Sequence, residues 1–163
     1  MSGAAAGLVR KDYAGDVAAD MGFHIGLNVP DMEAGLAFYQ GVLGLELSWR
    51  HYVSGPVLEQ ITGIPGAEAD VAQLLCPGGS RLELTAYVPT GSAEPVRQNN
   101  VGLTHLSFGV NDVPGVQKRL EAAGLKFASR PLAISDPSHP LDGWTVAYLS
   151  DPFGTTLELL GRT

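Results

Sequence analysis

Residues 72–84 read Ala-Gln-Leu-Leu-Cys-Pro-Gly-Gly-Ser-Arg-Leu-Glu-Leu, and residues 147–159 read Ala-Tyr-Leu-Ser-Asp-Pro-Phe-Gly-Thr-Thr-Leu-Glu-Leu. The two stretches align without a gap at an offset of 75 (147 − 72), and seven of the thirteen positions are identical. Composition alone does not account for such agreement. The repeat indicates that one module was duplicated, so both copies should share a fold and place equivalent residues equivalently.

A second repeat lies upstream of each of these stretches. Residues 24–32, His-Ile-Gly-Leu-Asn-Val-Pro-Asp-Met, align with residues 105–113, His-Leu-Ser-Phe-Gly-Val-Asn-Asp-Val, at an offset of 81 (105 − 24). The His, Val and Asp positions are identical, and the apolar positions are kept. Each stretch then enters a helix-like segment that ends at a glycine, Gly44 or Gly124, as helices commonly do.

The hydrophobic periodicity predicts the same order of elements, β-α-β-β-β, in module one (residues 22–88) and module two (residues 102–161). Asp31 and Asp112 stand where the N-cap of each helix belongs. The sequence therefore predicts an α+β fold of two tandem βαβββ modules. The expected strands are residues 22–29, 45–52, 70–76 and 80–88 in module one, and residues 102–110, 125–129, 144–150 and 155–160 in module two.

Two longer connections interrupt this pattern. Residues 53–69 contain an apolar segment at 57–61 that predicts one or two helical turns, whereas residues 131–143 hold three prolines and read as irregular. Long loops in a compact domain often border a site, and we expect both connections to do so.

Length and composition exclude several classes of function. A chain of 163 residues with 45% hydrophobic content can bury one real core. A net charge of −7 without a Lys/Arg-rich run argues against a nucleic-acid partner, and no stretch approaches the roughly 20 apolar residues of a membrane span. Cys76 is the only cysteine, so a reducing cytoplasm fits best. Residues 1–20 read as a leader, flexible or forming an added helix, and the fold proper occupies residues 21–163.

The best-matched polar positions are a histidine on the first strand and a glutamate on the last strand of each module. His24 is to Glu83 as His105 is to Glu158, at separations of 59 (83 − 24) and 53 (158 − 105) residues that only the fold can bridge. Strand alternation turns each glutamate away from its flanking leucines and towards the concave face of the sheet. A carboxylate in such a cavity is costly unless it is paired or bound to metal.

These four residues form a candidate metal site. A lone histidine on a strand is usually a satisfied core residue, and a lone glutamate usually faces solvent. The recurrence of the pair in both modules favours ligation instead. Two imidazoles and two carboxylates suit one divalent metal per chain (Ni, Zn, Fe, Co or Mn) and leave two positions open in an octahedron.

The sequence resembles the vicinal oxygen chelate superfamily, which includes glyoxalase I, methylmalonyl-CoA epimerase, extradiol dioxygenases, fosfomycin-resistance enzymes and bleomycin-resistance proteins. The resemblance covers residues 22–161. It rests on the opening 24–32, on the helix end 38–45, Phe-Tyr-Gln-Gly-Val-Leu-Gly-Leu, and on the closing 151–159, Asp-Pro-Phe-Gly-Thr-Thr-Leu-Glu-Leu. It implies a cupped mixed sheet around the metal, frequent dimerisation and substrates that chelate the metal through two neighbouring oxygens.

The set His24, Glu83, His105 and Glu158 is similar to that of bacterial glyoxalase I, in which a metal-bound glutamate also moves the proton. The resemblance implies a lyase, isomerase or epimerase that stabilises an enolate or enediolate on a small oxygen-chelating substrate. Glu83 or Glu158 is the expected base, and the resemblance favours Glu158. Two alternatives stay open: an Fe(II) dioxygenase acting on a catechol-like compound, with both histidines and one glutamate as ligands, and a resistance protein that sequesters a natural product.

Other conspicuous residues are weaker candidates. Trp49, His51 and Tyr52 are candidates for the lining of the cup, although aromatic residues on a strand more often fill a core. Gln73 and Tyr148 occupy equivalent positions of the repeat, and we expect both to face the cavity. Two residues read as unrelated to the site: His139, in the irregular loop, and Cys76, in a turn.

Overall fold

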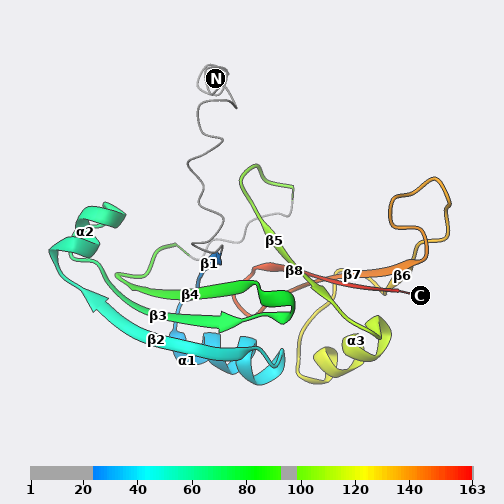
Figure 1. Cartoon of the computed structure of the whole chain (residues 1–163), viewed down its shortest axis with the longest axis horizontal. Coiled ribbons are helices and arrows are strands. Elements are labelled where there is room, and N and C mark those ends of the chain that lie inside the picture. Colours follow the sequence, from blue (N-terminus) through cyan, green and yellow to red (C-terminus); the bar gives the residue numbers. More distant parts are fainter. Residues whose placement is uncertain (1–23, 93–98, 163) are drawn as a thin grey trace, which may run out of the picture.

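The structure, a computed structural model, describes residues 24–92 and 99–162. The predicted leader, residues 1–20, lies outside the described residues. Within the described part, eight strands form two four-stranded mixed sheets, one from each module (Figure 1). The α+β fold of two βαβββ modules that the sequence predicts is therefore confirmed.

Module one forms the first sheet, in the strand order β1-β4-β3-β2. β1 runs parallel to β4, while the other two ladders are antiparallel. Its elements are β1 (His24–Asn28), α1 (Met32–Leu36), the π-helical turn η1 (Ala37–Val42), β2 (Glu46–Ser54), α2 (Pro56–Thr62), β3 (Glu68–Leu75), the 3-10 turn η2 (Pro77–Gly79) and β4 (Arg81–Val88).

Module two repeats this topology in the order β5-β8-β7-β6, with β5 parallel to β8. The strand register repeats as well. His24 pairs with Arg81 in module one and His105 with Thr156 in module two, positions that the sequence offsets relate to each other. The elements are β5 (His105–Gly109), α3 (Val113–Ala122), β6 (Leu132–Ala133), β7 (Trp144–Ser150) and β8 (Thr156–Arg162).

The helices begin and end where the sequence predicts. Asp31 accepts a hydrogen bond from the backbone N–H of Ala34 at 2.8 Å, and Asp112 accepts one from that of Gly115 at 2.9 Å. These bonds satisfy donors that the first helical turn leaves unpaired.

In the described part of the chain, no helix is long and apolar enough to span a membrane.

The second strand of module two differs from the prediction. The expected strand at residues 125–129 was wrong, because this segment contributes only an isolated bridge between Phe127 and Leu149. The ladder continues instead at β6, inside the loop that the sequence indicated as irregular. Pro131 explains the break, since a residue without an N–H interrupts the ladder. In module one, α2 confirms the helical turns predicted within residues 53–69.

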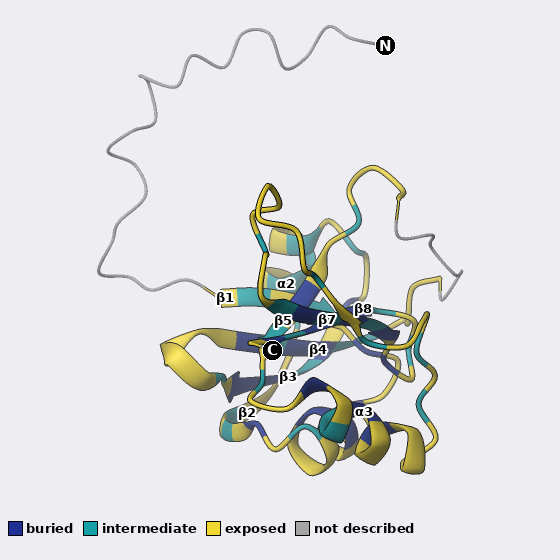
Figure 2. Ribbon diagram, turned by 90° about the vertical axis from the view of Figure 1, so that its right-hand side faces the viewer, coloured by how far each residue is buried: buried dark blue, intermediate teal, exposed yellow. Residues whose placement is uncertain are grey.

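One apolar core joins the two modules. α1 and α3 lie on one side of the strands (Figure 1), and buried side chains from both modules, dark blue in Figure 2, form a single cluster. Leu82 and Leu84 of β4 and Leu157 and Leu159 of β8 are at most 2% exposed. These four leucines define the helix-side face of each sheet, and the opposite face is called the open face below.

A buried hydrogen bond also connects the modules. The Tyr39 hydroxyl, in η1, donates to Oδ2 of Asp151, in the turn before β8, at 2.7 Å. The other carboxylate oxygen, Oδ1, accepts from the backbone N–H groups of Phe153 and Thr155 at 2.9 and 2.7 Å. Burial, reinforced by the Asp151 charge, raises the pKa of Tyr39 above its usual range. The phenol therefore stays a donor, and Asp151 ties module one to the turn that leads into β8.

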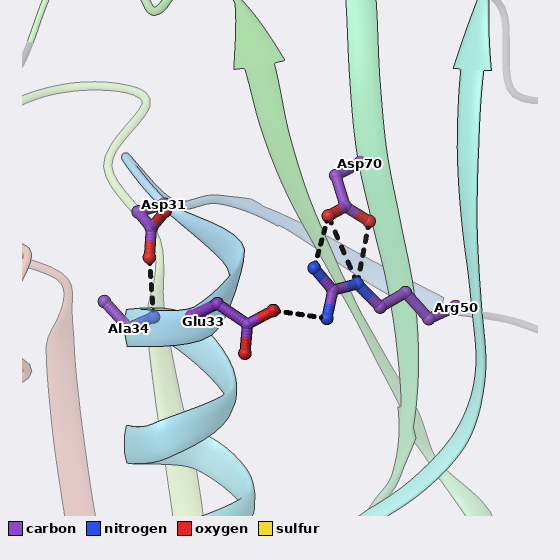
Figure 3. A network of polar contacts seen from close by, with 5 residues as sticks. All are labelled: Asp31, Glu33, Ala34, Arg50 and Asp70. Carbon is purple, nitrogen blue, oxygen red and sulfur yellow. Dashed lines mark hydrogen bonds and ion pairs between the residues drawn. The ribbon is translucent and has the colours of Figure 1, made fainter.

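An exposed ion network holds α1 against the first sheet (Figure 3). Nη1 of Arg50, on β2, lies 2.7 Å from Oε1 of Glu33 on α1, and Nη2 lies 2.6 Å from Oδ2 of Asp70 on β3. Nε of Arg50 also donates to both Asp70 oxygens. Because Glu33 belongs to the helix, Arg50 lies on the helix-side face, and its neighbours Trp49 and His51 lie on the open face.

Replacing Tyr39 with Phe should destabilise the protein, because Asp151 loses a buried charge-assisted hydrogen bond while the aromatic ring remains. We expect the free energy of unfolding, measured by urea denaturation, to fall by about 1.5–3 kcal/mol. Tyr52→Phe is a matched control, since the exposed Tyr52 hydroxyl bonds Glu68 at the surface and should contribute little. Equal destabilisation by the two variants would contradict the importance of the Tyr39–Asp151 bond.

Candidate metal centre

The two glutamates lie on the open faces of their sheets. Glu83 stands between Leu82 and Leu84 on β4, and Glu158 between Leu157 and Leu159 on β8. The leucines are buried against the helices, so alternation turns both carboxylates the other way. The orientation predicted from the sequence is thus confirmed for both residues.

The parallel ladders bring a histidine to each glutamate. Gly26 of β1 pairs with Glu83, and Ser107 of β5 pairs with Glu158, so each histidine sits two residues earlier on the same face. His24 Nε2 lies 3.8 Å from Oε1 of Glu83, and His105 Nε2 lies 3.8 Å from Oε2 of Glu158. The histidine–glutamate pair that is repeated in the sequence therefore has the same separation in both modules.

Each pair is suited to bind one divalent cation as two adjacent ligands. Metal bonds of roughly 2.0–2.2 Å from imidazole and carboxylate place neighbouring donor atoms about 3–3.4 Å apart. The observed 3.8 Å is close to this separation and too long for a direct hydrogen bond. The histidine side chains are 51% and 46% exposed, so their ring nitrogens remain accessible.

The structure does not bring the two pairs together within one chain. Among residues 24–92 and 99–162, no group of three or more His, Cys, Asp or Glu side chains lies close enough to hold one ion. One copy therefore offers two half-sites, half-site one (His24 and Glu83) and half-site two (His105 and Glu158). A four-residue centre remains a prediction, and it needs the two half-sites to meet.

Tyr148 lies beside both members of half-site two. It pairs with Glu158 across the β7–β8 ladder, and its ring meets His105 edge to face at 5.9 Å between centroids, with an interplanar angle of 80°. A hydrogen bond with Glu158, followed by burial, raises the pKa of the Tyr148 phenol. In module one the equivalent partner of Glu83 is Gln73. This register confirms that Gln73 and Tyr148 occupy equivalent positions, each opposite the glutamate of its module.

The second strand supplies further side chains to the open face of module one. Trp49 pairs with Gln73 and stacks near His51, with 5.6 Å between the ring centroids. Trp49, Gln73 and Glu83 thus form one cross-strand row. Tyr52 has the opposite parity to Trp49 and His51, and its hydroxyl bonds Glu68. Tyr52 therefore does not belong to the lining that the sequence suggested.

The remaining candidates lie apart from both half-sites. His139 Nδ1 accepts a hydrogen bond from the Leu141 N–H at 3.0 Å inside an exposed loop. Cys76 is half-buried, and burial raises the pKa of its thiol.

A cavity of about 750 Å³ opens between η1, the end of α3 and the β7–β8 turn. It lies among helix residues and not on the open faces, so it is separate from the histidine–glutamate pairs.

Comparison with known proteins points to one superfamily. The family model described as the Glyoxalase/Bleomycin resistance protein/Dioxygenase superfamily matches residues 23–159. Among curated proteins, the chain is similar to a 2-epi-5-epi-valiolone epimerase from an Actinomyces species. The two are 28% identical over 142 residues, which cover 84% of this chain and 76% of the relative.

Solved structures share the fold. A glyoxalase family protein from Bacillus cereus superposes with a TM-score of 0.72 and 21% identity, covering 85% of this chain and 91% of that one. The fosfomycin resistance protein FosX from Listeria monocytogenes, complexed with Mn(II) and sulfate, gives a TM-score of 0.56 and 19% identity, covering 86% and 91% of the chains. At these sequence identities, the similarity shows that the chains share a fold.

Changing His24, Glu83, His105 or Glu158 singly to Ala should weaken metal binding at least about tenfold, since each change removes one donor of the proposed centre. Metal content after dialysis, measured by inductively coupled plasma mass spectrometry, checks this. His139→Ala is the control, because this histidine lies in an exposed loop and should leave the content unchanged. Full metal content in all four variants would refute the assignment.

Proposed function

Because the chain belongs to the Glyoxalase/Bleomycin resistance protein/Dioxygenase superfamily, we propose that it is a metal-dependent isomerase. Its substrate is a small molecule with two neighbouring oxygens, and its reaction moves a proton on the carbon beside them. We place this activity in the cytoplasm, in keeping with a chain that carries one cysteine.

The observation that carries this proposal is the repetition of the histidine–glutamate pair with the same register and the same 3.8 Å separation. Neighbouring positions on the open faces have diverged, for example Arg81 against Thr156 and Gln73 against Tyr148. Retention of both pairs amid this divergence supports a shared chemical role, because surface residues without such a role tolerate change.

A second copy of the chain supplies the missing half of each centre in this proposal. The helix-side faces of both modules are buried in one core, which leaves both half-sites on open faces. β1 and β5 are outer strands in the described sheets, so a partner can approach along them. A symmetric dimer that joins half-site one of each copy to half-site two of the other contains two centres, one per chain.

The residues of the proposed centre have different roles in the reaction. When bound, a divalent cation draws electron density from the two substrate oxygens and acidifies the neighbouring C–H group. His24 and His105 hold the centre without carrying negative charge. One glutamate carboxylate takes the proton from carbon, and the other glutamate, in its protonated form, delivers a proton to that carbon from the opposite side. Gln73, Trp49 and Tyr148 border the half-sites and limit the shapes of substrate that fit.

An isomerase, and in particular an epimerase, fits better than a lyase. Inversion at carbon needs a proton to leave from one side and return on the other. Two glutamates that reach the substrate from two different half-sites meet this requirement. The relative from Actinomyces, which carries the name of an epimerase, supports the same choice.

The enzyme should exchange substrate hydrogen with solvent without consuming oxygen. We expect deuterium incorporation next to a carbonyl by NMR in D₂O, tested first on 2-epi-5-epi-valiolone and then on other 2-hydroxy carbonyl compounds. Replacing the glutamate that acts as base with Gln should slow exchange by about 10²–10⁴-fold. Stoichiometric oxygen uptake at an electrode would instead identify a dioxygenase. Tight ligand binding with no turnover and no effect of chelators would identify a sequestering protein.

Mixing two inactive variants should restore metal binding if the centre forms between copies. His24→Ala damages half-site one and His105→Ala damages half-site two. After the two proteins are unfolded and refolded together, half of the dimers are mixed, and each holds one centre with four intact ligands. We expect about a quarter of the wild-type metal content and exchange rate.

Each variant refolded alone is the control and should stay inactive. No recovery on mixing, together with a monomeric mass in sedimentation, would show that the proposed dimer is wrong.

A further inference from the structure

Gln73 is a nearly buried polar side chain on the open face of module one. It lies on β3, between Glu83 of β4 and Trp49 of β2 in the strand register. Its exposed fraction is 9%. Among the described residues, no backbone or side-chain group forms a hydrogen bond with its amide. An amide that is removed from water without gaining a partner is costly, so the fold alone does not explain this residue.

A second buried glutamine in the same chain shows the usual arrangement. Gln117, on α3, is 8% exposed, and its Nε2 donates to Oε1 of Glu121 at 2.8 Å. In the described part of the chain, no fully buried side-chain nitrogen or oxygen lacks a partner, so the Gln73 amide must reach the surface of the open face. A polar group that is nearly buried, reaches that surface and has no protein partner is suited to bind a ligand.

The cross-strand row that contains Gln73 has an aromatic ring on one side and open space on the other. Trp49 is half-buried, and His51 lies beside it with 5.6 Å between the ring centroids. Gly26 of β1 pairs with Glu83, and a Cβ atom added at this glycine would meet nothing within 4 Å. Neighbouring positions across strands are about 5 Å apart. A small ligand held at Glu83 therefore reaches Gln73 and, one strand further, the indole of Trp49.

The amide of Gln73 and the ring of Trp49 recognise different parts of a molecule. An amide offers two N–H donors and one carbonyl acceptor. Two neighbouring hydroxyls match it, because one accepts from the amide nitrogen while the other donates to the amide oxygen. The face of an indole carries partial negative charge and packs well against C–H groups. A carboxylate fits less well, since it offers no donor to the amide oxygen.

We propose that Gln73 and Trp49 form a subsite, beside half-site one, that binds a saturated ring bearing two neighbouring hydroxyls in addition to the two oxygens at the metal. This inference rests on the proposed function, because a carbon that is inverted by proton transfer is saturated. The substrate class is therefore a polyhydroxylated cyclic ketone. Tyr148 occupies the equivalent position in module two and has no amide, so the subsite belongs to module one.

The test compares two ring probes that share one pair of neighbouring oxygens. 2-Hydroxycyclohexanone carries only this pair, whereas pentahydroxycyclohexanone carries four further hydroxyls. Binding of each probe to the full-length protein is measured by isothermal titration calorimetry in buffer that contains Mn²⁺. We expect the wild-type protein to bind pentahydroxycyclohexanone about 10–100-fold more tightly, because two additional hydrogen bonds form with Gln73.

Variants separate the two parts of the subsite. Gln73→Met keeps the length of the side chain and removes both hydrogen-bonding groups, so it should abolish the preference while leaving the affinity for 2-hydroxycyclohexanone unchanged. Gln117→Met is the matched control, because it removes a buried amide on α3 and should leave the preference intact. Trp49→Leu should weaken the binding of both probes by about 2–10-fold, since both rings pack on the indole.

Three results would overturn the subsite: an equal loss of affinity for both probes in Gln73→Met, no preference in the wild-type protein, or no binding of either probe. Tighter binding of pyrogallol, a flat aromatic ring with three neighbouring hydroxyls, would overturn the saturated ring. Calorimetry requires no turnover, so the subsite and the proposed function can fail separately. A preference that Gln73→Met abolishes, in a protein that exchanges no deuterium into either probe, would support the subsite and contradict the proposed isomerase.

Discussion

The parallel ladder between the first and last strand of each module is the constraint on which the site depends. It pairs β1 with β4 and β5 with β8, strands that are separated in the chain by helical segments and two further strands. Leucines on either side of each glutamate are buried against the helices, so a shift of one residue would expose them and bury the carboxylate. Burial of the leucines thus fixes the register, and the register places a histidine 3.8 Å from each glutamate.

Burial of the helix-side faces also keeps the two half-sites of one copy apart. Both modules turn their helix-side faces inward to a shared core, so the two half-sites remain on open faces and do not converge. One copy therefore has a complete core but does not, among its described residues, gather the four proposed ligands in one place. Association with a second copy is required in this view because the ligands cannot meet without giving up the buried contacts between the modules.

The sequence predicted most of the fold because the residues that determine the module occur twice in the chain. The repeated glycine, aspartate and leucine positions located the helical segment after the first strand of each module, and seven of the eight described strands to within a few residues. The exception was the second strand of module two, where a proline interrupts pairing and the ladder moves to Leu132–Ala133. The histidine–glutamate pairs were located for the same reason. Their separation into two half-sites could not be predicted, because it depends on how the modules pack, and a repeat in sequence does not specify that packing.

The bond between Tyr39 and Asp151 has a consequence for the history of the chain. The repeat offsets place Leu120 and Cys76 at the equivalent positions, so the polar pair exists on one side of the pseudosymmetric contact and not on the other. Two copies of module one would oppose a phenol to a thiol, and two copies of module two would bury an aspartate without its donor. At this contact the two modules are therefore complementary halves, because neither carries both partners of the bond.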